Sequence, residues 1–345
     1  MRTSEYVSVG HPDKVADFIS EYILDRLLEQ DPETRYALEV QIKDNHVSLA
    51  GEITTKAELA EPCWFDWTKK ALAEIGYTQE YCNRWGTENT IDPSKLAVDT
   101  YISAQSPDIA QGVDNDGWGD QGIFWGMATK ETDSLLPRDY AVAKDLCQYL
   151  YELARKNDCP WGLDIKTQVT ISDKSLEILE VVVAAPCKPE HTSELADAVW
   201  EFLRTETKDA PVKLTINGTG AYIKHASIGD CGTTGRKLAV DFYGGNCPIG
   251  GGSPWTKDAT KADLTLNLYA RARAMRALRE YPETDTVRVS ISCAIGKKEI
   301  ITTIYDKNNK VLAIETSDMP AQHYIIMAGL KEPYNAFRCA HGLWG

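Results

Sequence analysis

Three segments of the sequence bring together the residue types that a polyphosphate site needs. The first is HPDK at residues 11–14, followed by apolar residues at helical spacing. Free N–H groups at a helix N-terminus suit a phosphate, Lys14 and His11 add positive charge, and Asp13 offers oxygen to a metal ion. A capped surface helix is the simpler interpretation of this tetrapeptide alone, because Asp and Lys are common in first turns.

The second segment is GDCGTTGRK at residues 229–237, which joins a flexible backbone to Arg236 and Lys237. Backbone amides beside two cations are what a polyphosphate requires. A glycine-rich turn with solvated basic residues explains this stretch equally well when it is read alone. It matches neither the G-x-x-x-x-G-K-S/T phosphate loop nor a dinucleotide-binding fingerprint.

The third segment holds glycines at 244–245 and 250–252, followed by Lys257, Lys261 and Asp263. The two lysines would share a helix face if a helix begins early, and Asp263 could bind a metal ion nearby. A hinge followed by a charged helix start is the alternative. Three such segments in one acidic chain together favour a polyphosphate site over three unrelated surface features.

The composition is that of a globular protein with a large core. The chain has 345 residues, of which 43% are hydrophobic and 26% charged, and this length suggests two or three domains. The formal net charge of −14 disfavours nucleic acid or an anionic membrane as a partner, because either would be repelled over much of the surface. A phosphate site must therefore be a local basic cluster.

The cysteines and the N-terminus favour a cytoplasmic protein. The nine cysteines are scattered, without a C-x-x-C pair or a metal-ligand spacing, so we expect reduced and mostly buried thiols. The first residues lack the apolar stretch of a signal peptide. No stretch approaches the roughly 18 uninterrupted apolar residues of a membrane span.

Hydrophobic periodicity predicts the elements that must position these segments. Helices are expected at residues 12–28, 67–75, 140–156, 193–204, 262–280 and 321–330. Strands are expected at residues 36–43, 46–54, 165–172, 176–185, 212–216, 238–240, 287–295, 299–305 and 311–315. Glu39 and Glu52 fall on the polar side of one predicted hairpin. Units of strand pair and helix recur three times, which indicates α+β domains with antiparallel sheets.

Two regions lack this periodicity. Residues 105–126 are rich in glycine and aspartate and predict a long loop, of the kind that often forms a lid or a site wall. Residues 217–261 form the second such region and contain most of the glycine-rich motifs.

Ordered motifs over nearly the whole chain resemble the S-adenosylmethionine synthetases, also called methionine adenosyltransferases. The matching motifs are SEYVSVGHPDKVAD from Ser4, GEITT from Gly51, QSPDIAQGV from Gln105, GDQGIFWGMATKETD from Gly119, DIKTQVT from Asp164, GDCGTTGRK, VDFYGG from Val240, the triple glycine with KDATKAD, and SCAIG from Ser292. So many motifs in the same order are a highly specific signal.

The resemblance implies a fold and an assembly. It implies three similar α+β domains of mainly antiparallel sheet around a pseudo-threefold axis, here at residues 1–104, 112–225 and 226–345. It also implies a homodimer or a dimer of dimers whose large flat sheets face each other. Each active site would then lie at a dimer interface and take residues from both subunits.

The resemblance also implies the reaction. Methionine sulfur attacks the ribose C5′ of ATP to give S-adenosylmethionine, and the triphosphate is then hydrolysed to phosphate and diphosphate. A thioether sulfur is a neutral nucleophile that needs no base, so positioning and charge stabilisation of the departing triphosphate should supply most of the catalysis. No acid/base dyad is expected.

Residue roles follow from the resemblance, position by position. Catalytic roles fall on His11, Lys14, Lys166, Arg236, Lys237 and Lys257. ATP contacts fall on His11, Asp120, Asp164, Lys166, Tyr222, Asp230, Arg236, Lys237, Ser253 and Lys257. Methionine contacts fall on Glu52, Gln105, Asp230, Lys261 and Ile295, and Glu5 matches a further active-site acid. Asp13 and Asp263 resemble ligands of Mg²⁺, with two ions expected per site, and Glu39 resembles a ligand of K⁺.

The chain departs from the family pattern near the adenine side. The usual G-R-F is Gly220-Ala221-Tyr222, and the usual V-I-G-G-P is residues 223–227, IKHAS. The triple glycine usually continues A-F-S-G-K-D but here continues SPWTKD from Ser253. The expected lid between Val113 and Gly119 is also shorter than usual, which bears on gating and substrate range.

Two other functions compete with the synthetase prediction. A noncatalytic subunit of the family would have no need to retain Asp13, Lys166 and Lys257. A hydrolase of ATP or tripolyphosphate would have no need of a methionine pocket at Glu52 and Gln105.

Overall fold

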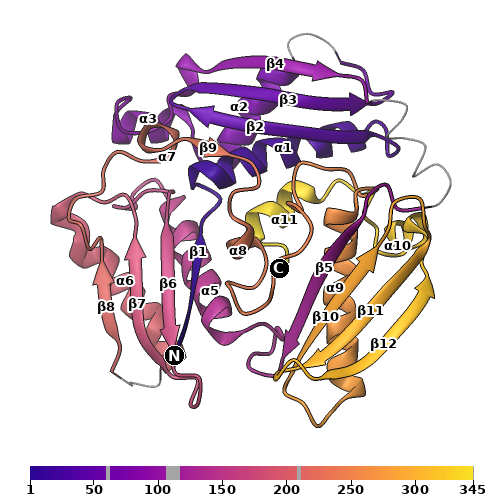
Figure 1. Ribbon diagram of the computed structural model, residues 1–345. Helices are drawn as coiled ribbons and strands as arrows, with labels where there is room; N and C mark the ends of the chain where they lie inside the picture. Colours follow the sequence, from indigo (N-terminus) through magenta and orange to yellow (C-terminus); the bar gives the residue numbers. More distant parts are fainter. Residues whose placement is uncertain (60–62, 106–116, 208–210, 345) are drawn as a thin grey trace.

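Three four-stranded sheets surround the centre of the molecule (Figure 1). The computed structural model describes residues 1–59, 63–105, 117–207 and 211–344. The first sheet has the order β4-β3-β2-β9, the second β1-β6-β7-β8, and the third β12-β11-β10-β5. Pairing is antiparallel except for β3 with β4 and β7 with β8, which confirms the α+β prediction with mainly antiparallel sheets.

The strands have the following bounds: β1 Arg2–Val7, β2 Arg35–Lys43, β3 His46–Thr54, β4 Ala97–Ser103, β5 Gly122–Thr129, β6 Lys166–Ile171, β7 Ile178–Ala184, β8 Lys213–Ile216, β9 Gly232–Thr233, β10 Thr286–Cys293, β11 Glu299–Asp306 and β12 Val311–Asp318. The α-helices are α1 Pro12–Leu28, α2 Cys63–Ile75, α3 Gln79–Trp85, α5 Arg138–Ala154, α6 Thr192–Thr207, α7 Ala226–Gly229, α8 Leu238–Asp241, α9 Ala262–Glu280, α10 Ala321–Met327 and α11 Asn335–His341. Short 3-10 turns are η1 Pro93–Lys95 and η2 Pro189–His191.

The recurring unit that the sequence suggests is a long helix followed by an antiparallel hairpin. It occurs as α1-β2-β3, α5-β6-β7 and α9-β10-β11. A further strand pairs antiparallel with the first strand of each hairpin, and it comes from a different part of the chain: β9 on β2, β1 on β6 and β5 on β10. The three units are therefore interlocked by exchanged strands. The linear division at residues 1–104, 112–225 and 226–345 stays a prediction.

Helix α1 lies at the centre of this arrangement. Arg26 is its one residue that is not buried, so the helix is enclosed on all sides rather than on one face. Its C-terminal half is joined to α11 through Asp25, whose carboxylate accepts hydrogen bonds from the backbone N–H groups of Asn335 and Ala336 at 3.0 and 2.9 Å. The last helix thus closes over the central one.

Two sequence expectations were wrong. Residues 238–240 form the start of the short helix α8 rather than a strand, because the N–H groups of Asp241 and Phe242 bond back to the carbonyls of Lys237 and Leu238. The predicted loop at 105–126 ends early, because β5 begins at Gly122 and pairs with β10. Residues 106–116, which include the first part of the expected lid, lie outside the described residues.

The cysteines are mostly buried, as the sequence predicts. Seven of the nine are buried, and no disulfide joins any of them in the described part of the chain. Within the described ranges, no helix combines the length and the apolar character that crossing a membrane requires.

Gly126 provides a test of the packing between β5 and α9. A Cβ at this position would lie 2.1 Å from the backbone carbon and oxygen of Ala270, so the helix backbone would have to move. Because such overpacking is poorly relieved, Gly126→Ala should lower the free energy of unfolding by about 1–3 kcal/mol or more. Urea denaturation followed by circular dichroism measures this change.

Gly218→Ala is the matched control, since Gly218 is exposed and its added Cβ would meet one flexible methyl group at 3.2 Å. Equal stability losses in the two variants would contradict the close packing at Gly126.

Candidate active site

The first turns of α1 hold the glycine-rich segment 229–237 in place. Asp13 Oδ1 accepts a hydrogen bond from the Thr233 N–H at 3.0 Å, and Asp17 Oδ1 accepts one from the Gly235 N–H at 2.9 Å. The two carboxylates are four residues apart and so lie on one face of the helix. Gly232 lies against the start of α1, where a Cβ would come 2.1 Å from the Pro12 carbonyl oxygen. Two motifs far apart in the sequence are thus brought together.

His11 is a neutral imidazole at the N-cap of α1. Its Nδ1 accepts a hydrogen bond from the Asp13 N–H at 3.1 Å, so the proton lies on Nε2. Burial, and then the positive charges of Lys166 and Lys237, lower the pKa of His11 to about 3. The ring therefore offers a neutral N–H donor close to two lysines.

Asp13 is paired with the cations of the second motif. Its carboxylate contacts Lys237 Nζ at 2.5 Å and an Arg236 guanidinium nitrogen at 3.6 Å. Burial alone would raise the pKa of Asp13, but the hydrogen bonds from Lys237 and the Thr233 N–H bring it below its usual value. Arg236 keeps 57% of its side chain exposed, so it is available to a ligand.

Lys14 is buried between two aspartates. Its Nζ donates to Asp241 at 2.7 Å and to Asp17 at 3.0 Å, and the residue is buried. Burial opposes its charge, yet these two carboxylates raise the pKa of Lys14 well above its usual value. The ion pair with Asp241 joins α1 to α8, and the catalytic role expected for Lys14 stays a prediction.

The third segment runs along the edge of β2. The Leu38 N–H donates to the Thr256 carbonyl at 3.0 Å, and the Asp258 N–H donates to the Tyr36 carbonyl at 3.0 Å. These bonds place Lys257 next to Ala37, and Lys257 Nζ forms an ion pair with Asp263 at the start of α9. The other Asp263 oxygen accepts the Gly252 N–H at 2.8 Å, which draws the triple glycine toward the helix.

Glu39 lies between the second and third segments. The Thr234 hydroxyl donates to one of its carboxylate oxygens, and the Thr256 hydroxyl donates to the other at 3.2 Å. Glu39 and Glu52 are on the same face of the β2-β3 hairpin, as the alternation predicts, because Glu39 is opposite Ala50 and Glu52 opposite Ala37. Glu39 is exposed on that face.

Asp164, Tyr222 and the start of α7 form a separate buried cluster. Asp164 Oδ2 accepts hydrogen bonds from the Tyr222 hydroxyl at 2.7 Å and the Ala226 N–H at 3.0 Å. Burial raises the pKa of Asp164, and the charge of Lys166 partly offsets this effect. Lys166 is the exposed first residue of β6, and Asp230 is exposed just after α7.

The remaining predicted residues are distributed over several elements. Some lie at the ends of sheets, and the others lie on α9, on β1 and in the loop that follows the triple glycine. Glu52 is near the end of β3. Gln105 follows β4, and its backbone N–H donates to the Thr54 hydroxyl at 3.0 Å. Asp120 and Ile295 flank the β5-β10 pair, since Cys293 Sγ donates to the Asp120 carbonyl at 3.4 Å. Lys261 is the N-cap residue of α9, the Ser253 hydroxyl accepts the Trp255 N–H at 3.2 Å, and Glu5 is exposed on β1.

Sequence reasoning missed Asp17, Asp241, Thr234 and Thr256, whose contacts shape the site. Asp17 carries a recognisable signal, because it is one helical turn from Asp13 and both follow a proline at a helix start. The other three form their contacts with residues nearly 200 or more positions away, which the pattern of one sequence does not reveal.

Comparison with known proteins matches each third of the chain to one family. Sequence models of the S-adenosylmethionine synthetase N-terminal, central and C-terminal domains match residues 1–107, 115–222 and 225–323. A solved structure of an unusual S-adenosylmethionine synthetase from Campylobacter jejuni is similar over 99% of this chain and 93% of that chain, with 30% identity and a TM-score of 0.87.

Replacing Lys14 tests the buried ion cluster. Lys14→Met leaves Asp17 and Asp241 buried without their cation, which should lower the free energy of unfolding by about 3–5 kcal/mol at pH 8. Burial already raises the pKa of Asp17 to about 7 in the folded protein. The folded state then binds more protons than the unfolded state, so the loss should shrink as the pH falls from 8 to 5.5. Urea denaturation at both pH values measures it.

Lys70→Met, at an exposed position of α2, is the matched control and should change stability by less than about 0.5 kcal/mol at either pH. A loss for Lys14→Met that is small, or equal at both pH values, would contradict the buried cluster.

Proposed function

We propose that this chain, a methionine adenosyltransferase that belongs to the S-adenosylmethionine synthetase family, makes S-adenosylmethionine by attack of methionine sulfur on the ribose C5′ of ATP. The observation that carries the proposal is the meeting of the three motifs. Segment 11–14 binds segment 229–237 through Asp13, and Glu39 joins segment 229–237 to the loop that bears Lys257. A polyphosphate-binding surface is thus assembled from motifs that individually mean little.

The protein's contribution to the reaction would be positioning and charge. His11 would donate its Nε2–H to a phosphate oxygen, and Lys166, Arg236, Lys237 and Lys257 would neutralise the triphosphate as it departs. Lys237 and Lys257 are each held by an aspartate, so their charges are placed before the substrate arrives. The subsequent hydrolysis of triphosphate to phosphate and diphosphate would use the same cations.

The adenosine would be bound beside the Asp164 cluster. Asp164 and Lys166 come from the start of β6, Tyr222 from the segment that leads into α7, and Asp230 from the residue after α7. Ser253 would contribute a backbone contact and Asp120 a carboxylate. Because the Tyr222 hydroxyl is held by Asp164, its ring would be fixed in orientation before it stacks on a base.

Methionine would be bound by residues at the sheet ends: Glu52, Gln105, Asp230, Lys261 and Ile295. Glu52 and Gln105 lie at the same end of the first sheet, since Glu52 is opposite Ser103 of β4. Their carboxylate and amide could receive the amino acid's ammonium group, and Lys261 its carboxylate.

Asp13 and Asp263 fit a role as ligands of Mg²⁺. In the described part of the chain, no three His, Cys, Asp or Glu residues gather into a cage for a metal ion. Magnesium commonly binds one or two carboxylates together with substrate phosphates, and each of these aspartates is paired with a lysine that a phosphate would attract. When bound, Mg²⁺ would neutralise charge on the triphosphate. Glu39 would be the K⁺ ligand, next to the oxygens of Thr234 and Thr256.

The active site would be shared between two subunits of a homodimer or a dimer of dimers. Exposed apolar side chains on the first and third sheets support an interface there: Tyr101 on β4, Ile123 on β5, Ile301 on β11 and Ile314 on β12. Burial of a patch of this kind is the usual reason for its presence.

The reaction is tested by incubating the purified protein with ATP, methionine, Mg²⁺ and K⁺ and following S-adenosylmethionine and phosphate by mass spectrometry. Lys166→Ala should reduce product formation by at least about 100-fold, because a preorganised cation beside the departing phosphate is lost. Lys174→Ala, at an exposed turn of the same domain, is the control and should retain wild-type activity. Phosphate without S-adenosylmethionine would favour the hydrolase, and ATP binding without either product would favour the noncatalytic subunit.

The shared site is tested by complementation. We propose that each site takes Lys166 from one subunit and Asp263 from its partner. Lys166→Ala and Asp263→Asn would then each inactivate both sites of a homodimer, but a heterodimer of the two variants would concentrate both changes in one site and leave the other intact. Co-expression in equal amounts should therefore restore about a quarter of wild-type activity. Activity no higher than that of either variant alone would place Lys166 and Asp263 of one site on the same subunit.

A further inference from the structure

A directed chain of hydrogen bonds crosses the junction between the α3 region and the segment that leads into α7. The Leu163 N–H donates to the Tyr81 hydroxyl at 3.1 Å, and the Tyr81 oxygen lies 2.7 Å from His225 Nε2. His225 Nδ1 in turn lies 2.7 Å from the Ile223 carbonyl oxygen. All of these groups are buried or nearly so.

The direction of each bond follows from its partners. A carbonyl oxygen can only accept, so the proton of His225 lies on Nδ1 and is donated to Ile223. Nε2 is then an acceptor, and the Tyr81 hydroxyl must donate to it. Burial lowers the pKa of His225 to about 4, so this neutral tautomer persists over the neutral pH range. The Tyr81 hydroxyl accepts one bond and donates another, which fixes its rotation.

The chain ends at the adenosine side of the site. The His225 N–H donates to the Asn89 carbonyl at 2.8 Å, so both the backbone and the ring of His225 are held by the α3 region. The next residue, Ala226, has a φ of +52°, and its N–H donates to Asp164 Oδ2. This left-handed conformation is costly for a residue with a Cβ, so surrounding contacts must maintain it. The same Asp164 oxygen also accepts a hydrogen bond from the Tyr222 hydroxyl.

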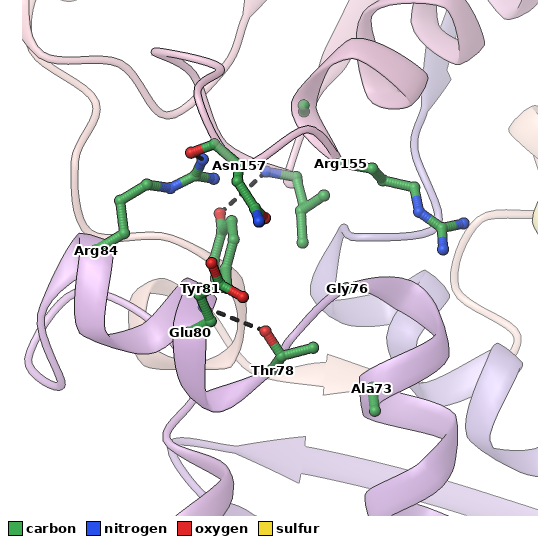
Figure 2. A pocket seen from close by; sticks show the side chains of 10 residues that line it. Ala73, Gly76, Thr78, Glu80, Tyr81, Arg84, Arg155 and Asn157 are labelled. Carbon is green, nitrogen blue, oxygen red and sulfur yellow. Dashed lines mark hydrogen bonds between the residues drawn. The ribbon is translucent and has the colours of Figure 1, made fainter.

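The rings around His225 leave it little freedom to move. The Tyr81 ring is 5.7 Å from the imidazole centre at an interplanar angle of 88°, and the Trp85 ring is 5.0 Å away at 77°. Tyr81 also lines a cavity of about 320 Å³ between α3 and the end of α5 (Figure 2). The Tyr81 hydroxyl accepts the backbone N–H of Leu163, which is one residue from Asp164.

We propose that Tyr81 and His225 are positioning residues for ATP, which set the placement of Asp164 and Tyr222 from both ends: Tyr81 through Leu163, and His225 through residues 223–226. Neither residue touches the substrate. The proposal rests on the proposed function, because it assigns Asp164 and Tyr222 to the ATP site. It also explains how the site is supported in a stretch, 223–227, that departs from the family pattern.

The test compares steady-state constants of the full-length protein for each substrate. Tyr81→Phe and His225→Ala should each raise the KM for ATP about fivefold to tenfold, as expected when one buried hydrogen bond that orders a binding group is lost. The KM for methionine and kcat at saturating ATP should stay within about twofold of wild type, because the methionine and triphosphate groups lie elsewhere. The effects of the two substitutions on the KM for ATP should be less than additive in free energy, because both remove the bond between Tyr81 and His225.

His225→Gln is the rescue variant, since its amide oxygen can accept the Tyr81 hydroxyl; its KM for ATP should lie closer to wild type than that of His225→Ala. Tyr151→Phe is the matched control, because Tyr151 is a buried tyrosine whose hydroxyl donates to the Ile75 carbonyl at 2.7 Å, outside this chain of bonds. It should lose stability without a change in the KM for ATP.

Melting temperatures and the Kd of ATP without methionine, measured by calorimetry, complete the experiment. A weaker ATP Kd in Tyr81→Phe and His225→Ala, but not in Tyr151→Phe, would support the positioning role even if the wild type made no S-adenosylmethionine, an outcome that would overturn only the proposed function. An ATP Kd and KM equal to those of wild type, with only the melting temperature lowered, would show that the pair is a packing contact and overturn the inference.

Discussion

The site depends on the edge of β2 that faces away from β3. A strand edge buried away from water must satisfy its N–H and C=O groups, and here two distant segments do so in succession. Residues 232–234 pair with β2 at residues 40–42, and residues 256–258 pair with it at residues 36–38. The pleat of one strand therefore sets the spacing between the second and third glycine-rich segments. Glu39 is between them and bonds to both.

The exchange of strands explains why the motifs meet. Each exchanged strand is next to a segment of the site: β1 precedes HPDK, β5 follows Asp120, and β9 is part of GDCGTTGRK. At these places the chain passes from one sheet to another around the centre of the molecule (Figure 1). The β9 crossing brings residues 233 and 235 to the beginning of α1, where they bond to Asp13 and Asp17. Stability of the fold and assembly of the site depend on the same backbone pairing.

The chain is acidic overall, and three of its lysines form ion pairs with nearby aspartates. Lys237, Lys257 and Lys14 are each paired with aspartate, and the first two pairs are partly open to solvent while the third is buried. An open pair can exchange its partner for a phosphate or a metal ion at modest cost, whereas breaking a buried pair would leave a charge without compensation. The difference in burial separates the cations that can bind a ligand from the one that holds the helix.

The sequence alone determined the fold class, the recurring unit of helix and hairpin, the common face of Glu39 and Glu52, and the burial of most cysteines. These depend on local periodicity, turn residues and composition, which act over a few residues. The motifs also identified the family, because their order along the chain is specific. Some elements were not predicted from the sequence. The strand expected at residues 238–240 is a helical turn, and β5 begins inside a glycine-rich stretch that was predicted to be a loop.

Only the tertiary structure decided what each charged residue does. HPDK contains two basic residues that look alike in sequence, yet the tertiary contacts leave His11 neutral beside two lysines and bury Lys14 between two aspartates. His225 lies in a stretch that departs from the family pattern, yet it bonds to Tyr81 and is followed by Ala226, whose N–H donates to Asp164. The physical reason is that burial and charge pairing come from residues far apart in the chain, such as Lys14 and Asp241, whose contact is created by the crossing of strands between sheets.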